Sequence, residues 1–119
     1  MLKRPINNRF REKVLSGNKT TTIRDKAWLV KTLIMLYSWE GLPYRSKQIN
    51  LCPIQVLGFW PISITKTHDG FMIYGCGKEG EPLWASEGFD SKEDMDNWFR
   101  PLVKEGETTK KYLMKFKRT

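Results

Sequence analysis

The stretch GNKTTTIRD, residues 17–25, marks the point at which a helix gives way to a strand. Before it, Phe10 and Val14 lie four residues apart, so they share one face of a short helix that the preceding asparagines can cap. Gly17 can end that helix, because glycine adopts the left-handed conformation of a final helical turn without strain. The β-branched threonines that follow favour an extended chain. We therefore predict a helix up to Gly17 and a strand over 18–24.

The downstream sequence alternates between apolar segments and turn residues. The strands that we predict there cover residues 32–39, 54–67, 70–77 and 110–117. The first of these is a continuous apolar run, which is typical of a strand buried on both faces. Residues 41–53 are polar and contain prolines, so we predict a loop there, and we expect the next strand to bend near Gly58 and Pro61.

A second helix is predicted over residues 90–103. Ser91 can cap it, and Asp94 occupies the position of a capping-box acid. Its apolar stripe consists of Met95, Trp98, Phe99 and Leu102. The elements together predict a mainly β fold with flanking helices (α+β), most simply a small open β-barrel.

Length and composition indicate one domain over residues 1–119. Hydrophobic residues make up 39% of the chain and aromatic residues 13%, which is enough for a core. We expect a monomer.

The charge is unevenly distributed. The net charge is +8, residues 1–31 contribute +7, and residues 108–119 contain five basic residues and no acid. If the two ends lie together, they would form one positive surface suited to a polyanion such as RNA. The alternative is that these lysines and arginines are ordinary solvated surface residues with no ligand.

Few residues suit a metal site. Cys52 and Cys76 are the only cysteines, and neither has CxxC or CxxH spacing, so we expect two reduced thiols, no metal and no cofactor. His68, the single histidine, lies in the turn-like sequence KTHDG. No leader pattern is present, and the longest apolar run is too short to cross a bilayer, so we expect a cytoplasmic protein without a membrane partner.

The opening stretch also gathers reactive groups. In an extended segment one face carries Thr20, Thr22 and Arg24, and the other carries Lys19, Thr21 and Ile23. A turn at residues 17–18 could still bring the Lys19 amine to the Thr22 hydroxyl. The simpler interpretation is a helix end followed by a polar edge strand.

GNKTTTIR resembles the G-x-K-x-x-[ET]-x-R signature of ASCH domains, a branch of the PUA-like superfamily of small RNA-associated barrels. It is most similar to the YqfB-like N(4)-acetylcytidine amidohydrolases, which read G-x-K-T-x-T-I-R-D. RFREKVLSG and YLMKFK resemble the helix and the closing strand of that group, and Glu87 falls where its second helical region begins. Residues 40–80 do not align by eye, and 39–53 look like an insertion or a rebuilt loop.

This resemblance implies a catalytic triad of Lys19, Thr22 and Glu87 that hydrolyses the acetamide of N(4)-acetylcytidine, or of a related nucleoside or nucleotide, to cytidine and acetate. Expected substrate-binding residues are Arg24 and the backbone near Gly17 as oxyanion donors, Thr20, and Trp84 as a stacking surface. Two other functions remain open. One is a non-catalytic RNA-binding module, and the other is a ribonuclease of the ASCH type.

Overall fold

The longest strand, β4 (Gln48–Thr67), runs through the centre of the structure, a computed structural model that describes residues 2–67, 70–74, 83–104 and 106–119. The other strands are β1 (Leu2–Pro5), β2 (Thr21–Arg24), β3 (Leu33–Trp39), β5 (Gly70–Tyr74) and β6 (Thr108–Arg118). The helices in this part of the chain are the 3-10 turn η1 (Asn8–Phe10), α1 (Arg11–Leu15), α2 (Leu83–Glu87) and α3 (Lys92–Phe99). The predicted mixed α+β class, with mainly β content, is confirmed.

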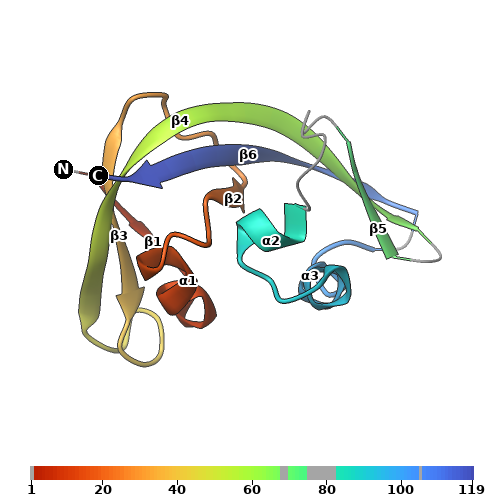
Figure 1. Ribbon diagram of the computed structural model, residues 1–119. Coiled ribbons are helices and arrows are strands. Elements are labelled where there is room, and N and C mark those ends of the chain that lie inside the picture. Colours follow the sequence, from red (N-terminus) through yellow and green to blue (C-terminus); the bar gives the residue numbers. More distant parts are fainter. Residues whose placement is uncertain (1, 68–69, 75–82, 105) are drawn as a thin grey trace.

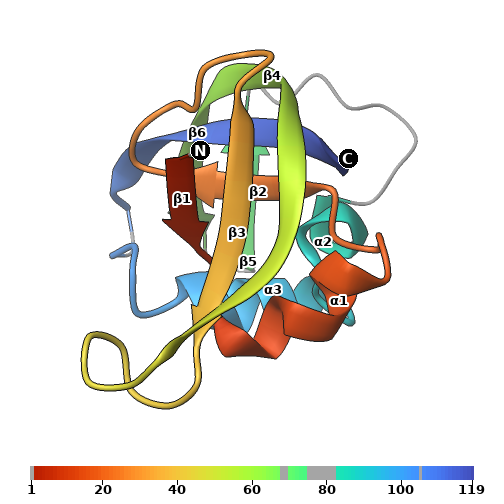
Figure 2. The ribbon, with the colours of Figure 1, turned by 90° about the vertical axis from the view of Figure 1, so that its left-hand side faces the viewer.

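The six strands form one mixed sheet. Its order is β1-β3-β4-β6-β2, with β5 paired to β4. The β1–β3 pair is parallel and the others are antiparallel. β4 and β6 arch over the three α-helices, which lie on the concave side (Figure 1). β3 and the start of β4 cross in front of β6 and β2, so the sheet curls (Figure 2). Among the described strands the hydrogen-bonded path ends at β1 and β2, and the sheet is not closed into a barrel.

The core lies inside this curl. Fully buried apolar side chains of the central strands are Ile34, Leu36, Ile54, Val56, Ile64, Leu113 and Met114. Val14 of α1 packs into the same cluster, as the predicted helix face requires. Each such side chain contributes roughly 1.5–3 kcal/mol by leaving water.

The predicted N-terminal helix is confirmed at both ends. Asn7 caps η1 by accepting a hydrogen bond from the Arg9 backbone, and Gly17 follows α1 with a φ of 81°. The next strand is shorter than predicted, because β2 begins only at Thr21. The backbone amides of Lys19 and Thr20 bind the carbonyls of Lys13 and Ser86, which keeps residues 18–20 out of the strand.

Three details of the sequence prediction are wrong. β3 is not buried on both faces, because its residues alternate between buried and partly exposed from Leu33 onward. The loop predicted over 41–53 is shorter, since Gln48–Asn50 pair with Tyr37–Trp39 and extend β4. Leu102 is 61% exposed, because α3 ends at Phe99 and does not carry the apolar stripe further.

Other predictions are confirmed. Ser91 caps α3 by accepting from the Asp94 backbone, and Met95 and Phe99 are buried. The register of β4 against β6 shifts between Val56 and Gly58, where a bend was expected. β5 pairs with β4 as the predicted hairpin requires.

Of the two cysteines and the single histidine, the structure describes only Cys52. Cys52 is a buried free thiol whose pKa is raised by burial. His68, Cys76 and the predicted strand residues 75–77 lie outside the described part of the chain.

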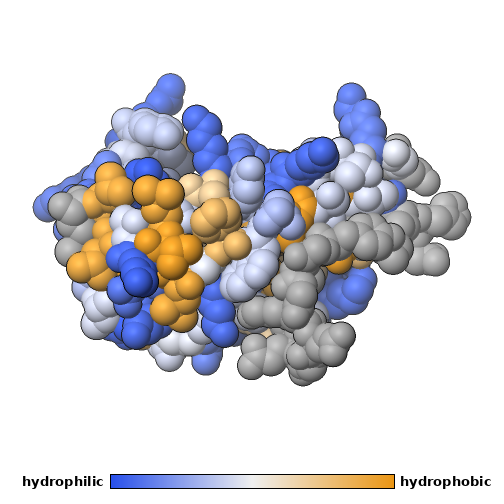
Figure 3. Space-filling model, turned by 90° about the horizontal axis from the view of Figure 1, so that it is seen from above, coloured by the Kyte–Doolittle hydropathy of each residue, from blue (hydrophilic) through white to orange (hydrophobic). Residues whose placement is uncertain are grey.

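The two chain ends lie at the same end of the molecule (Figure 1). They are not adjacent there, because β3 and β4 lie between β1 and β6 in the sheet. Seen from above, hydrophobic side chains gather at this end of the molecule (Figure 3). Three leucines in these segments are exposed: Leu2 of β1, Leu29 before β3, and Leu33 of β3.

Candidate functional site

Lys19 is buried although it carries a basic group. The turn after α1 directs its side chain inward, where it is only 4% exposed. Its Nζ donates a hydrogen bond of 2.6 Å to the backbone carbonyl of Glu87 and lies 4.6 Å from the centre of the Phe10 ring. A buried ammonium is costly, so such a lysine is an uncommon structural choice.

The environment lowers the pKa of Lys19. Burial is the largest cause, because it disfavours the charged form. The Glu87 carboxylate opposes this effect and raises the Lys19 pKa, whereas the Arg24 guanidinium adds to it and lowers the pKa. A larger fraction of the amine is therefore neutral near neutral pH than in an exposed lysine.

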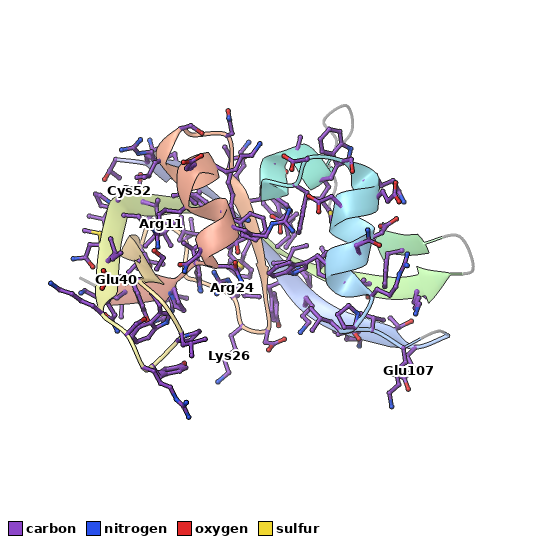
Figure 4. The ribbon with its side chains drawn as sticks, turned by 90° about the horizontal axis from the view of Figure 1, so that it is seen from below. Arg11, Arg24, Lys26, Glu40, Cys52 and Glu107 are labelled. Carbon is purple, nitrogen blue, oxygen red and sulfur yellow. The ribbon has the colours of Figure 1, made fainter. Side chains whose placement is uncertain are left out.

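Thr22 and Arg24 project from the same side of β2. The Nε of Arg24 donates a 3.1 Å hydrogen bond to the Thr22 hydroxyl, and its Nη2 donates to the Pro5 carbonyl at 2.6 Å. The guanidinium also lies 5.2 Å from the centre of the Trp28 ring. Seen from the concave side, Arg24 lies near the centre of the molecule, whereas Lys26 points outward (Figure 4). Arg24 thus presents a fixed cation beside the Thr22 oxygen.

Glu87 enters the site from the last residue of α2 and is 4% exposed. Its carboxylate accepts a hydrogen bond from the hydroxyl of Thr21, while its backbone carbonyl accepts the one from Lys19. Thr21 is fully buried, and its hydroxyl also lies 3.1 Å from that of Ser86. Glu87 is therefore anchored through Thr21, a residue that the sequence did not single out.

These side chains line a pocket of about 170 Å³. Its polar lining residues are Asn7, Lys19, Thr22, Arg24 and Glu87. Its aromatic lining residues are Phe10, Phe89 and Trp98. The structure thus brings all three members of the predicted triad, together with Arg24, into one cavity. Within it, the Lys19 amine donates to the backbone carbonyl of Glu87, the Thr22 hydroxyl accepts from Arg24, and no hydrogen bond joins Lys19 to Thr22 directly.

The other predicted binding residues lie in a neighbouring hollow of about 590 Å³. It is lined by Gly17, Thr20 and Trp84, and it shares Phe89 with the first pocket. The Gly17 amide bonds to the Val14 carbonyl and the Thr20 amide to the Ser86 carbonyl, so these two backbone groups are already engaged within the fold. Arg24 is the member of the predicted binding set that faces the triad.

Three aromatic rings replace Trp84 as the wall of the triad pocket. The ring centres of Phe10 and Phe89 lie 5.2 Å apart, and those of Phe10 and Trp98 lie 5.5 Å apart. The Arg9 guanidinium covers this cluster and pairs with Asp94 at 2.6 Å. The sequence analysis placed Trp98 on the apolar stripe of the helix. Helical spacing alone does not distinguish a residue of the core from one that lines a pocket.

The described residues contain no group of three or more histidine, cysteine, aspartate or glutamate side chains that could hold a metal ion. In the same residues, no helix has the length and apolar character needed to cross a membrane. Comparisons of the chain with protein-family models, with curated proteins and with solved structures find no match.

Proposed function

We propose that this protein is a metal-independent amidohydrolase that removes the acetyl group from N(4)-acetylcytidine, or from a related acylated cytosine nucleoside or nucleotide. One observation carries the proposal: Lys19, Thr22 and Glu87, predicted from separate parts of the sequence, line one pocket with Arg24. Buried lysines and glutamates are rare in a purely structural role. Their convergence beside a hydroxyl supports a catalytic one.

We further propose that the fold is of the PUA-like ASCH type. A curled sheet whose ends do not join, with its helices on the concave side, is compatible with a small open barrel. The motif lies at the junction of α1 and β2, as the resemblance implies.

In the proposed first step, the Thr22 oxygen attacks the acetyl carbonyl carbon and its proton passes to the neutral Lys19 amine. The Arg24 Nε lies 3.1 Å from the Thr22 oxygen, so the guanidinium charge stabilises that oxygen as it loses its proton and becomes negative. The carbonyl oxygen becomes an oxyanion, for which the Arg24 guanidinium and the new Lys19 ammonium are the available donors. The C–N bond then breaks, and the cytosine amino group leaves with the proton from Lys19.

The second step releases acetate. Water attacks the acetyl ester on Thr22, Lys19 or Glu87 accepts the proton, and the Thr22 hydroxyl is restored. The sum is one water and one acetamide converted to cytidine and acetate. Glu87 acts mainly by holding the Lys19 amine through its carbonyl, and Thr21 holds the carboxylate in turn.

The size of the pocket limits what can enter it. A volume of about 170 Å³ is below the roughly 300–1,000 Å³ of pockets that enclose a drug-sized ligand. A single pyrimidine or its acyl group suits this space, and the sugar would lie outside. Trp98, which is less buried than Phe10 and Phe89, offers the apolar surface that a base needs.

The test is acetate release from N(4)-acetylcytidine, its nucleotide and an acetylated RNA, followed by chromatography. Thr22→Val and Lys19→Met should each lower kcat by about a thousandfold or more, because each removes a group that acts in the transition state. Thr65→Val and Lys26→Met make the same chemical changes outside the pocket and should leave kcat unchanged. Full activity of either pocket variant would refute the triad.

The same assay separates the two alternative functions. RNA binding without acetate release, unaffected by Thr22→Val, would favour the non-catalytic module. Shortening of the RNA would favour a ribonuclease.

A further inference from the structure

The hairpin between β3 and β4 carries a row of aromatic rings outside the proposed catalytic pocket. The ring centres of Tyr37 and Trp39 are 5.7 Å apart, and those of Trp39 and Tyr44 are 5.2 Å apart. Tyr44 is 88% exposed, and the loop that carries it extends away from the rest of the molecule (Figure 4). Tyr37 and Trp39 are partly exposed as well, so the row is not part of the buried core.

The loop that presents Tyr44 is well ordered by hydrogen bonds. The Arg45 amide donates to the Leu42 carbonyl, and the Ser46 hydroxyl both accepts from the Gly41 amide and donates to the Leu42 carbonyl. Tyr44 has a φ of 63°, in the left-handed region where glycine or asparagine is favoured. A bulky side chain that keeps this conformation in an exposed turn is held out toward solvent despite backbone strain.

Basic groups accompany the rings. Arg45 and Lys47 are exposed in the loop itself, where Glu40 is the one acid. The surface therefore combines an aromatic row with an excess of positive charge.

We propose that Tyr37, Trp39 and Tyr44, with Arg45 and Lys47, form a binding site for single-stranded nucleic acid. Every base has a flat face that stacks on an aromatic ring, and phosphates pair with arginine and lysine. A net charge of +8 favours a polyanion over the other ligands of aromatic rows, such as proline-rich peptides. The site is separate from the triad pocket and does not depend on the proposed hydrolysis.

The probe is a fluorescently labelled oligouridylate, which has no acetyl group and so cannot report on hydrolysis. Fluorescence anisotropy should show binding by the native protein. Tyr44→Asn removes the ring but keeps a residue that tolerates the left-handed turn, and it should weaken binding by about tenfold. Tyr44→Phe keeps the ring and should bind like the native protein.

The matched control is Phe59→Asn, which removes an exposed ring from the part of β4 that pairs with β6. It should leave the affinity unchanged. The double variant Arg45→Gln with Lys47→Gln should flatten the plot of log affinity against log salt by about 0.7 for each charge removed.

Three results would overturn the proposal. They are no oligonucleotide binding by the native protein, equal binding by Tyr44→Asn, and Tyr44-dependent binding of a proline-rich peptide or of anionic lipid vesicles in place of the oligonucleotide. None of them bears on acetate release, so this proposal and the proposed hydrolysis can fail independently.

Discussion

Lys19 lies between two charges that act on its pKa in opposite directions. Glu87 raises that pKa and Arg24 lowers it, while burial, the largest influence, lowers it as well. If the neutral amine is the base, the rate must rise with pH as Lys19 loses its proton. The position of this rise on the pH axis then reports the Lys19 pKa.

Two variants should move that rise in opposite directions. Arg24→Gln removes a positive neighbour, so the Lys19 pKa increases and the rise moves to higher pH. Glu87→Gln removes a negative neighbour, so the Lys19 pKa decreases and the rise moves to lower pH. The measurement is kcat/KM for acetate release as a function of pH, with Lys26→Met as the control. Shifts of both variants in the same direction would show that another group titrates.

The site could be predicted from the sequence where the short motif pointed to a residue, or where the resemblance did, as it did for Glu87. Lys19, Thr22 and Arg24 lie within six residues, and their shared pocket follows from the turn at Gly17. The role of Thr21 could not be predicted, because its hydroxyl gains a carboxylate partner only when α2 packs against β2. No local pattern in the sequence reports a contact between such distant segments.

At the level of elements, the end of α2 positions one side of the site. Gly88 follows Glu87 with a φ of 93°, and its amide bonds to the Ala85 carbonyl. A Cβ on Gly88 would lie 3.1 Å from Phe10 Cδ1 and 3.4 Å from the Cβ of Lys19. The turn therefore needs glycine for its conformation and also for space.

Gly88→Ala and Gly17→Ala separate these two requirements. Gly17 has a φ of 81°, but a Cβ there meets nothing within 4 Å. Gly17→Ala should cost about 1 kcal/mol in the free energy of unfolding, from the left-handed conformation alone. Gly88→Ala should cost about 2–4 kcal/mol, because crowding against Phe10 and Lys19 adds to the strain. Urea denaturation measures both values. Equal losses of unfolding free energy in the two variants would mean that the Phe10 side chain moves aside at no cost.

The elements that the sequence predicted well are those with local end signals. Asn7, Gly17 and Ser91 mark helix ends through contacts within a few residues, and the structure keeps each of them. The length of β4 was underestimated because residues 48–53 become a strand only through pairing with β3. Such pairing overrides the turn propensity of a polar segment that contains a proline.

Across the whole molecule, β6 connects the core to the site. It pairs with β4 along one edge and with β2 along the other, so Ile23 lies opposite Leu113 and Thr22 opposite Met114. Leu113 and Met114 are both fully buried. Among the described strands, β2 pairs only with β6, so the position of Thr22 depends on how well β6 is packed.

Leu113→Ala should therefore affect both stability and the site. Removing a fully buried leucine side chain should lower the free energy of unfolding by about 2–5 kcal/mol. Leu102→Ala makes the same change at a side chain that is 61% exposed, and it should cost less than about 0.5 kcal/mol. Urea denaturation gives both values, and hydrogen exchange should show faster opening of the β2 amides in Leu113→Ala alone. Unchanged exchange in β2, despite the loss of stability, would mean that the strand is held in place by α2 through Thr21 and Glu87 and not by the core.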